Sequence, residues 1–315
     1  MRIGIDLGGT KIEALVLGDG GAELLRIRRP TPRSYEGSIE AIAELVAELE
    51  SGLGRRATVG LGMPGALSPA TGLVKNANST WLIGRPLGAD LAERLGREVR
   101  LANDANCFAL SEASDGAAAG AGCVFGVIVG TGTGGGLAVH GKIWTGPNAV
   151  AGEWGHNPLP WPSGDEWPGP RCYCGKTGCI ETFLSGPGLA RDYRAHAGDG
   201  AAGATAEQVA ARAASGDFPA RAALSRYAER MARALASVIN VVDPEVIVLG
   251  GGLSRLPHLY EEVPRLWGRW AFSDRVDTRL VPPRHGDSSG VRGAAWLFTE
   301  EEGRAARGAA GATLS

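Results

Sequence analysis

The chain has 315 residues, of which 44% are hydrophobic and 21% charged, and a formal net charge of −2. This length is more typical of two domains than of one, and the near-neutral charge gives no indication of a nucleic-acid partner or an anionic membrane. Neither a basic leader pattern nor an apolar span of membrane length is present, and the cysteines are clustered, so we expect a cytoplasmic protein with a small-molecule ligand.

The first 120 residues have the pattern of an α/β domain. Three strands are predicted first, at 2–6, 12–17 and 23–29, with a hairpin turn at 19–21, and we expect them to be antiparallel neighbours. Apolar residues at helical spacing follow over 35–53 and end at Gly54. The other elements predicted here are a strand at 58–63, a helix at 87–95, a strand at 99–102 and a helix at 104–119.

After residue 120 the same order begins again. It has a strand at 123–129, a glycine- and threonine-rich loop at 130–136 and a second strand at 137–140. Helices at 206–215, 219–242, 258–270 and 289–298 and strands at 246–249 and 278–281 complete the predicted elements. We therefore predict two α/β domains, 1–120 and 121–288, with a last helix at about 289–299 that packs back on the first domain and a flexible tail at 300–315.

Three glycine-rich turns each follow a predicted strand. Glycine lets backbone N–H groups approach phosphate oxygens closely, and threonine hydroxyls add donors. One such turn is usually a plain turn, but three of them, two in repeated units, favour a bound nucleotide. The candidate nucleotide-binding residues are Asp6, Gly8, Gly9, Thr10, Lys11, Gly130, Thr131, Gly132, Thr133, Gly134, Gly251 and Gly252. Asp6 either holds Mg²⁺ through water or bonds its own turn, and Lys11 contacts either phosphate or solvent.

The pair Asn103-Asp104 stands between a predicted strand and a predicted helix. An aspartate at this position is either a helix N-cap or a catalytic base at the carboxyl end of a strand, where open α/β sheets bind their ligands. Sequence periodicity does not choose between these two interpretations.

The stretch from Glu153 to Glu181 contains three of the five cysteines. Cys172, Cys174 and Cys179, with His156 upstream, could complete a closed, tetrahedral zinc site, and Gly175 and Gly178 would allow so tight a turn. A disulfide or free thiols are the alternatives. Closing the metal site would also bring the carboxylates of Glu153 and Glu181 to one place.

These motifs, in this order and over nearly the whole chain, resemble those of the ROK family (repressors, open reading frames and kinases). The matching segments are Asp6–Lys11, Asn103-Asp104, Gly130–Gly134, Glu153–His156, Cys172–Glu181 and Val248–Gly252. Three further segments, 75–81, 153–161 and 285–296, resemble its bacterial fructokinase/mannokinase branch. The resemblance implies an actin-like (ribonuclease H-like), duplicated two-domain ATPase fold that binds sugar and ATP in the interdomain cleft. It also implies a homodimer.

The resemblance assigns a role to each matched site residue. Asp104 becomes the general base that accepts the proton of the attacking sugar hydroxyl, with Mg²⁺ and backbone N–H groups offsetting the phosphate charge. The implied sugar-binding residues are Gly65, Asn78, Asn103, Asp104, Glu153, His156 and Glu181. A structural zinc ion on one nitrogen of His156 would leave the other N–H to donate to a sugar oxygen.

The expected activity is transfer of the ATP γ-phosphate to the 6-hydroxyl of fructose, and also of mannose. N-acetylglucosamine kinase and glucokinase share nearly all of these motifs and are the alternatives. A sugar-responsive repressor would need a DNA-binding domain ahead of Asp6, where only five residues stand. A sugar sensor without catalysis would not need the base at Asp104.

Overall fold

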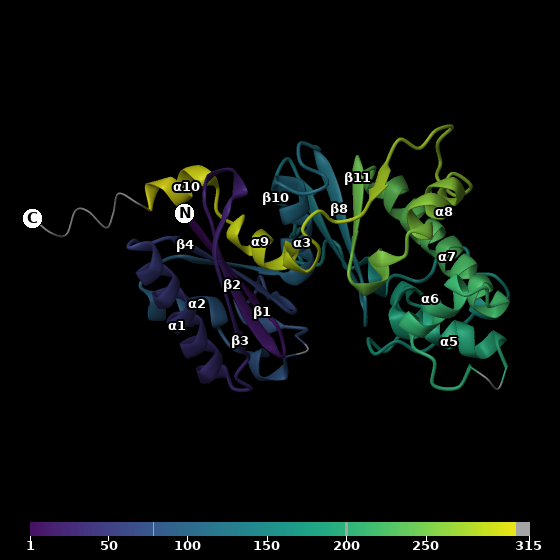
Figure 1. Cartoon of the computed structure of the whole chain (residues 1–315), viewed down its shortest axis with the longest axis horizontal. Coiled ribbons are helices and arrows are strands. Elements are labelled where there is room, and N and C mark those ends of the chain that lie inside the picture. Colours follow the sequence, from purple (N-terminus) through teal and green to yellow (C-terminus); the bar gives the residue numbers. More distant parts are fainter. Residues whose placement is uncertain (78, 199–200, 307–315) are drawn as a thin grey trace, which may run out of the picture. The chain divides into compact units, whose positions relative to one another are not determined.

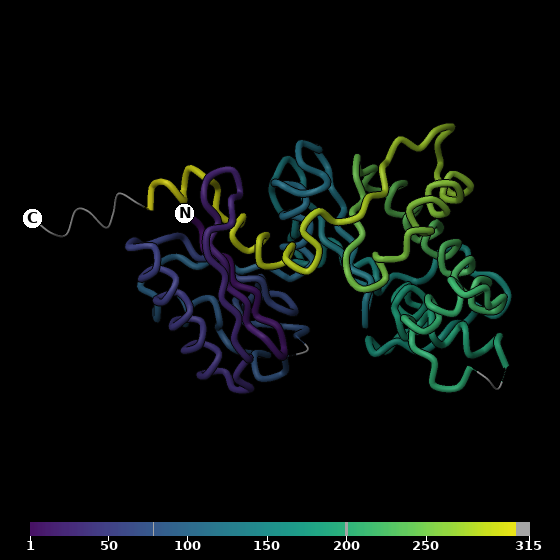
Figure 2. Tube along the Cα trace, viewed as in Figure 1, coloured from purple at the N-terminus to yellow at the C-terminus, as the bar shows by residue number. Residues whose placement is uncertain are grey.

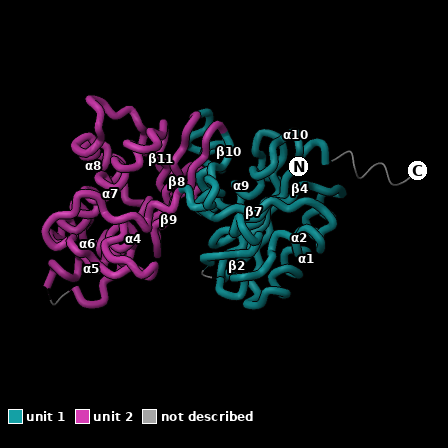
Figure 3. Tube along the Cα trace, turned by 180° about the vertical axis from the view of Figure 1, so that it is seen from behind, with its two compact units in different colours: residues 1–120, 141–151, 287–315 teal, residues 121–140, 152–286 magenta. Residues whose placement is uncertain are grey.

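The computed structural model describes residues 1–77, 79–198 and 201–306. The chain divides into two compact units (Figure 3). Unit 1 comprises residues 1–120, 141–151 and 287 onward, and unit 2 comprises residues 121–140 and 152–286. The predicted domains, 1–120 and 121–288, differ from these units chiefly in the segment 141–151, which the sequence assigns to the second domain.

Unit 1 is built on a five-stranded sheet with the order β3-β2-β1-β4-β7 (Figure 1). Its strands are β1 (Arg2–Leu7), β2 (Lys11–Leu17), β3 (Glu23–Pro30), β4 (Thr58–Met63) and β7 (Val99–Asn103), with short strands β5 (Ala66–Leu67), β6 (Val74–Lys75) and β10 (Lys142–Ile143). Its helices are α1 (Tyr35–Leu53), α2 (Leu87–Leu95), α3 (Asp104–Ser114), α9 (Ser289–Ala295) and α10 (Glu300–Ala305), and its 3₁₀ turns include η1 (Asp19–Gly21) and η2 (Thr80–Leu82). Another, η7 (Gly286–Ser288), precedes α9.

Both faces of this sheet are covered, and alternation along β2 shows how. Ile12, Ala14 and Val16 join the core formed with α1 and α2, whereas Leu15 and Leu17 pack with Val291 and Ala295 of α9. Successive side chains of a strand point to opposite faces, so one strand supplies both layers. The predicted antiparallel pairing of β1, β2 and β3 is confirmed.

Glycines let α9 lie unusually close to the sheet and to α3. A Cβ atom at Gly4 of β1 would lie 2.1 Å from the Val291 carbonyl oxygen, and one at Gly60 of β4 would lie 1.9 Å from that of Ala294. A Cβ atom at Gly293 of α9 would lie 1.7 Å from the Cys107 carbonyl oxygen. The C-terminal segment therefore returns to the first strands, as Figure 2 shows in yellow beside purple.

Unit 2 repeats this strand order. Its strands β9 (Thr133–Val139), β8 (Cys123–Val129), β11 (Val246–Gly250) and β12 (Arg279–Val281) lie in the order β9-β8-β11-β12, which matches β2-β1-β4-β7 of unit 1. Its helices are α4 (Ile180–Leu184), α5 (Gly186–His196), α6 (Ala206–Ala214), α7 (Phe218–Val242) and α8 (His258–Trp267), with 3₁₀ turns η3 (Trp154–His156), η4 (Gly164–Glu166) and η6 (Gly252–Arg255). The predicted duplication is confirmed, and all five helices contribute to one core with β8 and β11.

A buried ionic cluster holds the proline- and tryptophan-rich insert on α7. Glu166 in η4 accepts hydrogen bonds from Arg230 and Arg233 at 2.7 Å, and Arg230 also donates to Asp192 of α5 at 2.7 Å. Burial raises the pKa of Glu166, but the bonds from Arg233, Arg230 and the Ser163 N–H outweigh it and hold that pKa at about 2. The insert is thereby fixed to the helical core by paired charges, which tolerate burial where single charges do not.

Several predicted boundaries are wrong; the helices predicted at 258–270 and 289–298 end at Trp267 and Ala295. Helix α3 ends at Ser114 and not at residue 119, because the buried Glu112 carboxylate accepts the Ala117 N–H at 2.8 Å. Residues 133–136 form part of strand β9 and not a loop, because Gly135 leaves room for the rings of Trp154 and Phe125.

The predicted flexible tail is also wrong over its first residues. Glu300–Ala305 form helix α10, whose N-terminus has a capping box between Thr299 and Glu302. Arg100 of β7 is paired with Glu302 at 2.7 Å, which ties α10 to the sheet. Residues 307–315 of the predicted tail lie outside the described residues.

Candidate functional site

In unit 1 the candidate residues gather at one edge of the sheet. Strands β1, β4 and β7 are parallel, and their register places Asp6 beside Gly62 and Gly62 beside Ala102. Asp6, the segment after Met63 and the pair Asn103-Asp104 therefore follow neighbouring strand ends, which is where open α/β sheets place their ligands. Of these residues, only Asp104 is predicted from the sequence to lie where an α/β sheet binds its ligand.

The N-cap role that the sequence left open for Asp104 belongs to Asn103. The Asn103 side chain is the N-cap of α3, since its oxygen accepts the Ala105 N–H at 2.9 Å, while its amide donates to the Gly65 carbonyl at 3.0 Å. Asp104 is the first residue of the helix and is exposed; one of its carboxylate oxygens accepts the Ala105 N–H at 2.8 Å. The helix N-terminus stabilises this carboxylate as an anion.

The carboxyl group of Asp6 at this edge has a raised pKa. Burial, the charge of Asp104 and that of Glu13 raise its pKa from 3.8 to about 6, against the opposing charge of Lys11. Lys11 is paired with Glu13 at 3.3 Å and its side chain is 49% exposed. A buried anion of this kind is stabilised when a cation binds beside it.

The turn between β1 and β2 is closed by its own backbone. The Gly8 N–H donates to the Lys11 carbonyl at 3.0 Å, and Thr31 donates through its hydroxyl to the Gly8 carbonyl at 2.7 Å. Gly9 and Thr10 form the exposed tip. Gly65 follows β4 with φ of +78° and lies against the backbone of Lys75 and Ala77, whereas Asn78 lies outside the described residues.

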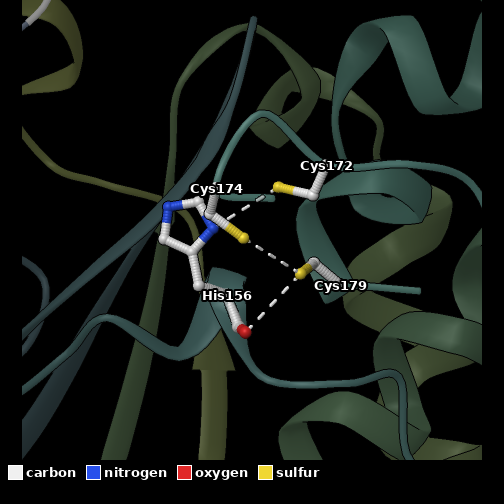
Figure 4. Close-up of side chains that lie close together, drawn as sticks. All are labelled: His156, Cys172, Cys174 and Cys179. Carbon is white, nitrogen blue, oxygen red and sulfur yellow. Dashed lines mark hydrogen bonds between the residues drawn. The ribbon is translucent and has the colours of Figure 1, made fainter. Parts of the chain in front are cut away.

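In unit 2 the four predicted metal ligands come together (Figure 4). Their ligand atoms all lie within 4.8 Å of one another. The Cys174 and Cys179 sulfurs are 3.6 Å apart, and the Cys172 sulfur is 3.6 Å from Nδ1 of His156. A tetrahedral ion with bonds of about 2.0–2.3 Å would hold such pairs about 3.6–3.8 Å apart, so the residues fit a metal. All five cysteines are free thiols, which excludes the disulfide alternative in this structure.

The loop Cys172–Cys179, called the knuckle below, is closed by positive φ angles at two glycines, as the sequence predicts. Gly175 has φ of +90° and Gly178 has φ of +69°. The Cys172 N–H donates to the Lys176 carbonyl at 2.8 Å, and the Gly175 N–H donates to the Cys172 carbonyl at 3.0 Å. The sulfur positions are therefore determined by backbone bonds of the loop itself.

The three candidate sugar-binding residues of unit 2 lie on elements that pack together, η3 and α4. Glu153 is exposed and precedes η3, which ends at His156. Glu181 lies in α4 and accepts the Thr133 N–H at 3.0 Å, while its other carboxylate oxygen is 4.0 Å from the Cys172 sulfur. Glu181 thus links the knuckle to the turn between β8 and β9, a contact that the sequence does not indicate.

Close packing positions η3 against strand β9. A Cβ atom at Gly155 would lie 2.0 Å from the Thr133 carbonyl oxygen, and the Trp154 indole N–H donates to the Gly134 carbonyl at 3.0 Å. The Trp154 ring also contacts Phe125 edge-on, with centroids 5.7 Å apart. Gly134 therefore serves the strand, and its predicted role as a nucleotide contact remains a proposal.

Two of the glycine turns meet at a cavity of ≈ 820 Å³ within unit 2. Gly130 and Thr131 follow β8, and Gly252 follows β11, which lies beside β8. The opposite lining comes from helices α5 and α6 and includes Pro187, Ala190, Arg194, Thr205, Ala206, Glu207 and Ala210, with Leu253, Arg255 and Leu256 from η6. Its size suits a nucleotide-sized molecule.

Of the two helices that line this cavity, the sequence predicts α6 but not α5. Helices α4 and α5, over Ile180–Leu184 and Gly186–His196, are not predicted. A signal for α5 is present in Ser185-Gly-Pro-Gly188, because serine is a favoured N-cap and proline is favoured in the first turn. Ser185 is that N-cap, and it accepts the Gly188 N–H at 3.2 Å.

Solved structures with the same fold show the class of protein. The fold is the mixed α/β, actin-like ATPase fold of sugar kinases. A hexokinase structure from Thermus thermophilus superposes with a TM-score of 0.82 at 34% identity, covering 94% of this chain and 97% of that one. A Streptomyces griseus glucokinase, solved with glucose and AMPPNP, superposes with a TM-score of 0.73 at 29% identity, covering 94% and 98%.

The sequence profile of the ROK family matches residues 2–301, and the chain belongs to that family. The N-acetyl-D-glucosamine kinase of Escherichia coli O127:H6 is 42% identical over 303 residues, covering 94% of this chain and 99% of that protein. The enzyme of the same name from Shigella boydii is 42% identical over 312 residues, with the same coverage. The chain is therefore a ROK sugar kinase, a phosphotransferase that uses ATP. None of its described helices combines the length and apolarity needed to cross a membrane.

Proposed function

We propose that the protein transfers the γ-phosphate of ATP to the 6-hydroxyl of a hexose, with Asp104 as the general base. The carrying observation is the placement of an exposed carboxylate at the first turn of α3, beside the ends of β1 and β4. Asp104 accepts the proton of the attacking hydroxyl late in the reaction. A carboxylate suffices as base because the transition state of phosphoryl transfer is loose and positioning dominates.

Sugar binding is proposed for two groups of residues. In unit 1, Asn103, Gly65 and Asn78 supply it with Asp104; Asn103 and Gly65 are already joined by their 3.0 Å hydrogen bond. In unit 2, Glu153, His156 and Glu181 accept from or donate to sugar hydroxyls. Charged acceptors of this kind bind hydroxyl donors more strongly than neutral ones do.

Nucleotide binding is proposed for the cavity of unit 2 and for the turn of unit 1. Gly130, Thr131, Gly251 and Gly252 lie at or next to the cavity lining, with Gly132, Thr133 and Gly134 following in the same turn and strand. Gly9 and Thr10 would offer backbone N–H groups at the tip of the β1–β2 turn, Lys11 would add its ammonium, and Gly8 would lie close to phosphate while its own N–H closes the turn. Asp6 would hold Mg²⁺ through water, and its raised pKa marks a buried carboxyl group that a cation would stabilise. Bound Mg²⁺ would neutralise part of the phosphate charge.

Zinc is proposed at His156, Cys172, Cys174 and Cys179. Three thiolates and one imidazole are a ligand set typical of structural zinc, and the 3.6 Å separations of Cys174 from Cys179 and of Cys172 from His156 Nδ1 fit it. Four protein ligands leave no open position, so the ion would supply rigidity to the knuckle. The knuckle carries His156 and leads into α4 with Glu181.

Two hexoses compete as the preferred substrate. Fructose is favoured by the resemblance of segments 75–81, 153–161 and 285–296 to the fructokinase/mannokinase branch. N-acetyl-D-glucosamine is favoured by the names of the 42% identical relatives. We retain fructose, with mannose, as the first proposal because those three segments include the sugar-binding candidates Asn78, Glu153 and His156.

The test is ATP consumption with fructose, mannose, glucose and N-acetylglucosamine, compared by kcat/KM. Asp104→Asn should lower kcat by several powers of ten with little change in ATP affinity. A matched control is Asp217→Asn, which alters the helix-end carboxylate that caps α7 by accepting the Ala220 N–H at 2.7 Å. Near-normal turnover of Asp104→Asn would exclude the base assignment, and N-acetylglucosamine as best substrate would exclude fructose. The implied homodimer is a further prediction, tested by light scattering.

A further inference from the structure

Tyr173 stands between two of the metal ligands and contacts a third. Its hydroxyl oxygen is 3.0 Å from Nε2 of His156. The two rings meet edge-on, with centroids 5.1 Å apart and an interplanar angle of 84°. Because Nδ1 of His156 faces the Cys172 sulfur, Nε2 is the nitrogen directed away from the cysteine cluster.

The chemistry of imidazole determines what Nε2 does. A metal on Nδ1 requires that nitrogen to be deprotonated, so the single ring hydrogen resides on Nε2. Nε2–H would then be a donor, and the Tyr173 oxygen, 3.0 Å away, would be its acceptor. One N–H group makes one strong hydrogen bond at a time, so an incoming sugar oxygen needs the hydrogen that Tyr173 holds.

The contact is also easy to break. Tyr173 is 84% exposed, so its side chain has little packing besides the His156 ring. Its backbone is held between Cys172 and Cys174 by the bonds of the knuckle, so the ring can turn away without moving a ligand. An exposed tyrosine that turns into solvent regains a hydrogen bond to water.

We propose that Tyr173 is a positioning residue that competes with the sugar for the Nε2–H of His156 and so lowers the affinity for sugar. This inference rests on the proposed function, in which His156 donates to a sugar oxygen. The exchange involves one neutral hydrogen bond, so its effect on sugar affinity is about fivefold. The opposite arrangement, in which Tyr173 stays in place and passes a hydrogen bond on to the sugar, would make the hydroxyl favourable for binding.

The test compares Tyr173→Phe and Tyr173→Leu with the wild-type protein. The probe is whichever of fructose, mannose, glucose and N-acetylglucosamine the wild type phosphorylates with the highest kcat/KM. Isothermal titration calorimetry without nucleotide should give a Kd about fivefold lower in both variants, with kcat within about twofold of wild type. Bound zinc, measured by mass spectrometry, should stay at the wild-type ratio.

Tyr35→Phe is the matched control, since it removes the same hydroxyl from a tyrosine of unit 1 that donates to Asp90 at 2.5 Å. It should leave the sugar Kd unchanged. ¹⁵N-histidine spectra should show the Nε2–H tautomer of His156 in every variant, with its proton shifted in Tyr173→Phe. A sugar Kd that is unchanged or raised in both Tyr173 variants would overturn the competition. Failure of the wild type to phosphorylate any of the four sugars would instead refute the proposed function, and absence of sugar binding would overturn both.

Discussion

Replacing Asp6 by asparagine should stabilise the protein while removing its activity. The pKa of Asp6 is raised from 3.8 to about 6 by burial first and by Asp104 second. A carboxyl group with a raised pKa in the folded state binds its proton more tightly there than in the unfolded chain. The unfolding free energy therefore falls as pH rises from about 4 to about 6. Two units of pKa correspond to about 3 kcal/mol, an upper value for the gain of Asp6→Asn at pH 7.

The assay is urea unfolding between pH 4 and 8 in magnesium-free buffer, followed by intrinsic fluorescence. The wild type should lose stability across that window, and Asp6→Asn should show a flatter profile. Asp104→Asn should retain most of the slope, because burial is the larger cause and Asp104 the smaller. An Asp6→Asn profile as steep as the wild-type profile would refute the reasoning, as would a loss of stability at pH 7.

Three further predictions concern stability. Glu166→Gln should lower the unfolding free energy by about 3–5 kcal/mol, because it leaves buried arginines unpaired. Since the pKa of Glu166 is lowered to about 2, the wild type should lose stability as pH falls from about 4.5 toward 2, and the variant should show a flatter loss. Gly293→Ala should cost about 3 kcal/mol or more, because its Cβ atom would overlap the Cys107 backbone, whereas Gly268→Ala, with nothing within 4 Å, should not destabilise. Chelation of the metal should lower the Tm and the sugar affinity of the wild type together. The same chelator should change neither quantity in Cys174→Ser, because that variant should already lack the ion. A metal content in Cys174→Ser equal to that of the wild type would contradict the ligand set.

Much of the fold could be predicted because its signals are local. The apolar residues of β1 and β2, the Asp19–Gly21 turn and the helical spacing over 35–53 each depend on a few neighbouring residues. The repeat of strand, glycine turn and strand was also visible, and the matching strand order of the two sheets follows from it. The start of strand β9 is predicted wrongly because glycines usually indicate a turn. The ring of Trp154 that faces Gly135 explains why a glycine stands in this strand.

Helices α4, α5 and α10 show where prediction from local signals fails. Helices α4 and α10 have five and six residues, so the apolar period has too few turns to be recognised. Helix α5 begins with Gly-Pro-Gly, which usually indicates a turn. Their stability comes from capping bonds and from packing, such as the pairing of Glu302 in α10 with Arg100 of β7. Long-range pairs of this kind are not encoded by spacing along the chain.

By itself, the sequence determined the family resemblance, the duplicated architecture and the candidate ligand set of the cysteine knuckle, because these depend on residue types at short, regular spacings. The tertiary structure decided which groups meet. It assigned the N-cap of α3 to Asn103 and left the adjacent carboxylate of Asp104 exposed. It brought the turns at Gly130 and Gly252 to one cavity, and it placed Tyr173 on the second nitrogen of His156. These outcomes depend on strand register, helix packing and side-chain rotamers, which involve residues far apart in the chain.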